Sequence, residues 1–190
     1  MKSIQKTGIT AVVVLSVIIS MSSCKDTATR TTSVKKTETT ALAKRVSSFS
    51  IADIVASYLV LKNKLTQEDA QGASQAAQAL QLAFKNANPN KIEAEHQQSY
   101  TTLSKAAVAA TEQLLANGDA IALQRKNFAD LSKQMYLLIQ MFPTSQKLYH
   151  VYCPMYDQGK SGYWISETQD IQNPYYGSEM LTCGSIQQEL

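Results

Sequence analysis

Apolar residues recur every three or four positions through residues 50–142, which is the spacing of helices with one buried face. The repeat breaks near Thr66, at the segment NANPN (86–90) and at Gly118, and it stops at Pro143. Proline and glycine often end helices. The pattern therefore predicts four helices with these inward residues: Ile51, Ile54, Val55, Tyr58, Leu59 and Leu65; Ala70, Ala73, Ala77, Leu80 and Phe84; Tyr100, Leu103, Ala107, Ala110 and Leu114; Ile121, Phe128, Leu131, Met135, Leu138 and Phe142.

Short polar side chains precede each of these runs, as expected for helix starts. Four similar helices with short connections favour an all-α fold, an up-down antiparallel four-helix bundle over residues 50–142. The residues that we expect at the four helix starts are Ser50 with Asp53, Thr66 with Asp69, Asn90 with Glu93, and Asp119.

The pattern changes after Pro143, where aromatic and β-branched residues alternate with turn residues. Segments 149–152 and 163–165 favour short strands, and Gly159, Gly162, Pro174 and Gly177 favour turns. We expect residues 143–190 to form a small turn-rich appendage that packs on the bundle. Together, residues 49–190 form a single predicted domain.

The N-terminus has the features of an export signal. Lys2 and Lys6 precede an apolar run over residues 8–21, which is too short to span a membrane. The sequence MSSC then resembles the lipobox of bacterial lipoproteins, which predicts a signal peptide over residues 1–23 and a lipid-modified Cys24. Residues 24–48 are rich in threonine and lysine and predict a flexible tether. We expect a lipid-anchored protein of the cell envelope, in the outer membrane or facing the periplasm.

The composition gives little support for catalysis or for nucleic-acid binding. The formal net charge of +3 falls to about +1 without the two leader lysines, so a nucleic-acid partner is not expected. The helices carry no nucleophile motif, phosphate-binding loop or carboxylate pair. Glu93 and His96 have the spacing of a bundle metal motif, but a second such pair is missing from the sequence. We therefore expect a solvated His96 and a protein that is not an enzyme.

Soft metal ligands gather in two short stretches of the C-terminal segment. The first is HVYCPM, with His150, Cys153 and Met155, and the second is MLTC, with Met180 and Cys183. Residues two apart in a strand share a face, and residues three apart on a helical turn do too, so each stretch can present a thiol with a thioether. Thiolate and thioether donors select Cu(I) and similar ions, whereas imidazole also suits Zn(II).

The same two cysteines have a second interpretation. In an oxidising envelope, Cys153 and Cys183 are natural partners of a structural disulfide. The methionines would then fill gaps in packing, and no metal cofactor would be needed. The residues alone leave both alternatives open.

Several motifs resemble an uncharacterised family of Gram-negative envelope lipoproteins, a domain of unknown function. They are YCPM, GYWIS, IQNPYYG and MLTCG in that order, with YLVLKNKLTQEDAQGASQAAQAL and QRKNFADLS in the helices. The resemblance covers roughly residues 50–190. Members of that family also occur fused to periplasmic adaptor subunits of copper/silver efflux pumps of the resistance-nodulation-division type.

The resemblance implies a role in handling heavy metals. It favours Cu(I), with Ag(I) or Zn(II) as alternatives, bound by Cys153, Met155, Met180 and Cys183, with His150 as a further candidate. The expected function is buffering the ion or passing it to an efflux adaptor, as a monomer. The alternative is a structural or interaction lipoprotein with a Cys153–Cys183 disulfide and no metal.

Overall fold

The structure is a computed structural model that describes residues 49–190. The predicted signal peptide, the lipidation site Cys24 and the tether over residues 24–48 lie outside the described residues. None of the helices within residues 49–190 is both long and apolar enough to cross a membrane.

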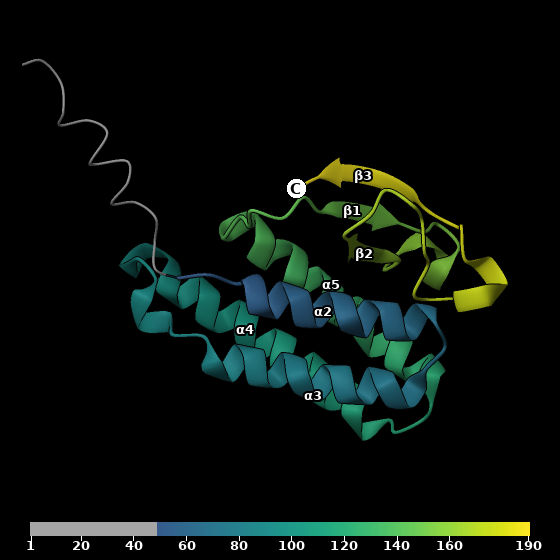
Figure 1. Ribbon diagram of the computed structural model, residues 1–190, viewed down its shortest axis with the longest axis horizontal. Coiled ribbons are helices and arrows are strands. Elements are labelled where there is room, and N and C mark those ends of the chain that lie inside the picture. The colour runs from purple at the N-terminus through teal and green to yellow at the C-terminus, as the bar shows by residue number, and fades with distance from the viewer. Residues whose placement is uncertain (1–48) are drawn as a thin grey trace, which may run out of the picture.

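Four α-helices make up most of the described chain, as predicted (Figure 1). They are α2 (Ala52–Thr66), α3 (Ala70–Asn86), α4 (Ala94–Ala116) and α5 (Ile121–Met141), and a short 3-10 helix, η1 (Pro89–Lys91), lies between α3 and α4. The predicted breaks are confirmed at NANPN, at Gly118 and before Pro143. Gly118 has a φ of 51°, the left-handed conformation that suits the residue after a helix end.

The helix starts differ in detail from the predicted ones. Asp69 itself caps α3, since its carboxylate accepts a hydrogen bond from the Gly72 amide at 2.8 Å. Thr66, the predicted cap, is the last residue of α2, and its hydroxyl donates to the Lys62 carbonyl. The predicted cap Asn90 lies in η1, and α5 begins without a side-chain cap. Local polar patterns therefore locate these helix starts to within a few residues.

A three-stranded antiparallel sheet follows the helices, in the order β2-β1-β3. Strands β1 (Tyr149–Tyr152) and β2 (Tyr163–Ser166) coincide with the two predicted strands. The third strand, β3 (Ser185–Glu189), was not predicted because its sequence, SIQQE, is mostly polar and all five residues are exposed. Two further 3-10 turns, η2 (Tyr156–Gly159) and η3 (Gly177–Met180), lie in the connections.

The sheet packs on the side of the helices formed by α5 and α2, and α3 lies on the opposite side (Figure 1). Most predicted inward residues are buried. Ala70, Ile121 and Phe142 lie at helix ends and are only partly buried, and Leu103 is only partly buried although it lies within α4. The helices pack pairwise as α2 with α3, α3 with α4, and α4 with α5. The up-and-down order of the bundle stays a prediction.

Within the described residues, one hydrophobic core joins the helices to the sheet, with members from Ile51 to Tyr175. A segment with its own continuous core can fold alone. Residues 47–190 are therefore the segment on which the measurements below are made.

A partly buried ion pair between Lys62 and Glu167, whose side chains are 2% and 25% exposed, attaches the end of β2 to α2. Lys62 is 2% exposed, and its Nζ lies 2.7 Å from the Glu167 carboxylate. The Asn63 amide donates to the other carboxylate oxygen at 2.9 Å. Burial alone would raise the pKa of Glu167, but the hydrogen bonds from Lys62 and Asn63 and the Lys62 charge lower it overall. The ionised pair therefore contributes to the attachment of the appendage.

A second polar attachment lies at the other end of the appendage. The Arg125 guanidinium on α5 donates to the Pro174 and Leu65 carbonyls and lies 3.5 Å from Glu68. Ser178 in η3 also donates to Glu68, at 2.9 Å. These contacts hold the segment that leads to Cys183 against α2 and α5.

Candidate functional site

The fold brings the two cysteines of the C-terminal segment together. Cys153 and Cys183 are thirty residues apart in the sequence, and their Sγ atoms lie 2.7 Å apart. Cys153 is buried, whereas Cys183 is partly exposed. The pair therefore has one inner sulfur and one sulfur close to solvent.

Cys153 is held by the end of the β1–β2 hairpin. Its amide donates to the Gly162 carbonyl at 2.8 Å, one residue beyond β1. A side chain at position 162 would bring its Cβ within 2.3 Å of the Cys153 carbonyl oxygen. Gly162 is therefore needed for the close approach that fixes the inner thiol.

Cys183 is held by the turn after η3 and by Asn173. The Cys183 amide donates to the Met180 carbonyl, and the buried Asn173 side chain donates to the Cys183 carbonyl at 2.8 Å. The Asn173 side-chain oxygen also accepts from the Tyr175 amide. The segment IQNPYYG therefore positions the outer thiol, although its conformation could not be read from sequence spacing.

The sulfur separation is compatible with two chemical states of the pair. Closure by about 0.7 Å would form a disulfide, whose sulfurs lie about 2.0 Å apart. Two thiolates that share one tetrahedral ion at about 2.3 Å each lie roughly 3.8 Å apart, so the pair must open by about 1 Å to hold an ion. Cys183 is the member that can move outward, because it is the less buried of the two.

The surroundings of Cys183 affect its protonation. Burial, the hydrogen bond with Cys153 and the Cys153 charge raise the pKa of the Cys183 thiol, and the Met155 amide opposes this shift. A raised thiol pKa means that little thiolate is present at neutral pH, so spontaneous exchange with other thiols is slow. A bound cation would favour the Cys183 thiolate over the protonated thiol, because metal binding displaces the thiol proton.

Both candidate methionines are near the pair in the chain and are exposed. Met155 is 57% exposed and Met180 is 39% exposed. The Met155 carbonyl accepts a hydrogen bond from the Tyr176 hydroxyl at 2.9 Å, which fixes the backbone beside the cysteines. The two methionines are thus surface residues whose backbones hydrogen-bond to Cys183.

His150 lies apart from the cysteines. Residues of β1 alternate in burial, and His150 is three positions from Cys153, which places the two on opposite faces of the strand. The imidazole stacks between the rings of Tyr136 and Tyr163, at centroid distances of 4.1 and 5.1 Å. Burial lowers the pKa of His150. The geometry therefore separates His150 from the other four candidate ligands.

The described residues contain no group of three or more His, Cys, Asp or Glu side chains that could hold a metal ion. Within the described residues, Glu93 and His96 belong to no such group either. The His96 side chain instead lies 3.4 Å from the neighbouring Glu95 and close to the Phe142 ring. The candidate site for an ion is thus the cysteine pair with thioether support.

Comparison with known proteins supports part of the resemblance. A family described as a protein of unknown function (DUF3347) matches residues 54–147. This match spans the four helices from within α2 and ends before β1, so the cysteine pair lies outside it. No curated protein matches the chain. No solved structure matches it either.

Proposed function

We propose that this chain is a non-catalytic, lipid-anchored envelope protein that binds one soft ion, Cu(I) or Ag(I), between Cys153 and Cys183. The observation that supports the proposal best is the meeting of two thiols from distant segments, with one buried and one at the surface. Two thiolates supply the soft donors that Cu(I) prefers over oxygen and nitrogen. The anchor would be Cys24, and the tether would hold the domain away from the membrane.

The methionines fit a role in loading and release. Met155 and Met180 are exposed, and their backbones hydrogen-bond to the partly exposed Cys183. Thioethers bind Cu(I) but carry no charge, so they would hold the ion more weakly than the thiolates do. We propose that they guide the ion into and out of the thiol pair, toward a partner such as a periplasmic efflux adaptor. We leave His150 out of the ligand set because it lies on the other face of β1.

A second candidate function has its own support. The 2.7 Å between the Cys153 and Cys183 sulfurs is closer to the sulfur separation of a disulfide than to that of an ion-bound pair. The raised pKa of Cys183 also disfavours the free thiolate. On this alternative, Cys153–Cys183 is a permanent disulfide, and the protein acts through its helical surface as a structural or interaction lipoprotein. A disulfide closing a thirty-residue loop contributes roughly 3–4 kcal/mol to stability.

An anaerobic Cu(I) titration of reduced residues 47–190 tests the proposal. The protein has two thiols in this form, which are counted beforehand, and a competing chelator sets the free Cu(I) concentration. We expect one tight equivalent of Cu(I), with release of thiol protons on binding. Binding that only matches the chelator background would contradict the proposal and leave the disulfide alternative.

A further inference from the structure

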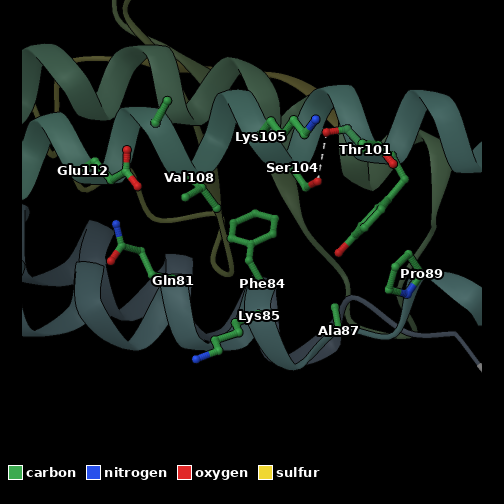
Figure 2. A pocket seen from close by; sticks show the side chains of 12 residues that line it. Gln81, Phe84, Lys85, Ala87, Pro89, Thr101, Ser104, Lys105, Val108 and Glu112 are labelled. Atoms are coloured by element: carbon green, nitrogen blue, oxygen red, sulfur yellow. Dashed lines mark hydrogen bonds between the residues drawn. The ribbon is translucent and has the colours of Figure 1, made fainter.

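A groove of about 700 Å³ lies between α3 and α4 and shares no lining residue with the cysteine segment. This volume is in the range of small-molecule sites. Figure 2 shows Gln81 and Glu112 at one end of the groove, Thr101 and Pro89 at the other, and Phe84 and Val108 between them. The remaining lining residues are Lys85, Ala87, Tyr100, Ser104, Lys105 and Ala109.

The Tyr100 hydroxyl in this groove is buried and has no hydrogen-bond partner within residues 49–190. Tyr100 is only 4% exposed, and its ring packs edge-on against Phe49 and Phe142. The neighbouring hydroxyls are occupied, since Thr101 donates to the Gln97 carbonyl and Ser104 donates to the Thr101 carbonyl. Burying a hydrogen-bond donor without a partner costs free energy. An unpaired hydroxyl at a groove therefore points to a ligand that supplies a hydrogen-bond acceptor.

The groove is apolar in its middle and positive toward the Tyr100 end. Phe84 and Val108 face one another across it (Figure 2). Lys105 lies about 7.5 Å from Tyr100 along the axis of α4, whereas Glu112 lies about 18 Å away. Lys85 also lines the groove from α3, but its amino group points away from the groove (Figure 2). The charges therefore favour an anionic group near Tyr100 and an uncharged body beyond it.

We propose that this groove binds a linear monocarboxylate of the fatty-acid class. The carboxylate accepts the hydrogen bond of the Tyr100 hydroxyl, with Lys105 about one and a half helical turns away, and the acyl chain lies along Phe84 and Val108 toward Gln81. This site is independent of the cysteine pair. It gives the helical part of the chain a ligand of its own.

The test is calorimetric titration of residues 47–190 with dodecanoate, kept below the concentration at which it forms micelles. We expect one equivalent to bind. Tyr100→Phe removes only the hydroxyl and should weaken binding by roughly tenfold to a hundredfold, as for a hydrogen bond to a charged group. Ala109→Leu fills the groove and should abolish binding, whereas Ala106→Leu is the matched control on the exposed side of α4, outside the groove, and should bind normally.

Thermal unfolding without ligand separates a binding role from a packing role. Tyr100→Phe should unfold at the same temperature as the unmodified protein or higher, because it removes an unpaired polar group. Methyl dodecanoate should bind more weakly than dodecanoate, since it lacks the charge. The proposal would be overturned if the unmodified protein does not bind dodecanoate. It would also be overturned if the Tyr100→Phe and Ala109→Leu variants bind dodecanoate as tightly as the unmodified protein does. Equal affinity for the methyl ester would overturn the assignment of a carboxylate.

Discussion

Replacing Cys183 with serine is expected to abolish tight Cu(I) binding by residues 47–190. The substitution removes one of the two thiolates that meet at Cys153. Changes that only reorient a ligand cost about 10–100-fold in metal affinity, so the loss of a ligand should cost more than roughly 100-fold. The chelator competition described above measures the difference.

The fold should survive this change, because Cys183 is only partly buried and lies outside the helices. Far-ultraviolet circular dichroism should therefore be unchanged. Met180→Leu is the matched control, since it keeps both thiols and replaces an exposed thioether with a side chain of similar size. It should weaken binding much less than Cys183→Ser. Tight binding that persists in Cys183→Ser would place the metal elsewhere.

Replacing Glu167 with alanine is expected to destabilise the protein by about 3–5 kcal/mol. This is the usual cost of leaving a buried charge without its partner, here the Lys62 ammonium at 2% exposure. The Asn63 amide also loses its acceptor. Urea unfolding at neutral pH measures the change as a lower midpoint.

Glu189→Ala is a suitable control for that measurement. Glu189 pairs with Lys147 at 2.8 Å, and both side chains are 56% exposed. Exposed ion pairs contribute little, so this variant should unfold within error of the unmodified protein. A double replacement of Lys62 by Met and Glu167 by Leu should recover much of the loss, because no buried charge is then unpaired. Equal unfolding midpoints for Glu167→Ala and Glu189→Ala would contradict this account.

The same ion pair predicts how stability changes with pH. The pKa of Glu167 is lower in the folded state than in the unfolded state, so its contribution is fully present above the ordinary carboxyl pKa. It is lost as the pH falls through the folded-state value. Glu167→Ala should therefore have a shallower loss of stability on the acid side than the unmodified protein, measured by urea unfolding between neutral and acidic pH.

The helices could be predicted because their buried residues follow one repeat. Leu80, Phe128 and Leu138 each continue a three-and-four spacing that only a helix places on one face, and all three are buried. The cap at Asp69 was harder to place, since Thr66 and Asp69 are equally good capping residues in the sequence. In the structure Thr66 ends α2, where its hydroxyl donates to the Lys62 carbonyl four residues earlier, and Asp69 caps α3 by accepting from the Gly72 amide.

The C-terminal segment was less predictable because its structure depends on contacts between distant residues. The polar strand β3 forms by pairing with β1, and its own residues carry no apolar alternation. The meeting of Cys153 and Cys183 depends on Asn173, whose side chain donates a hydrogen bond to the Cys183 carbonyl, ten residues later in the sequence. The exclusion of His150 follows from strand alternation, which could have been applied to HVYCPM once β1 was predicted. The buried Lys62 beside Glu167 has no signal in the local sequence.

The central claim is that both cysteine sulfurs bind one soft ion. X-ray absorption at the copper K-edge, on the anaerobic one-to-one complex of residues 47–190, tests it most directly. We predict only sulfur neighbours around Cu(I). In Cys153→Ser and Cys183→Ser alike, we expect less protein-bound copper and fewer sulfur neighbours around the copper that remains. Nitrogen or oxygen neighbours as the main ligands, or spectra that do not change in either variant, would contradict the claim.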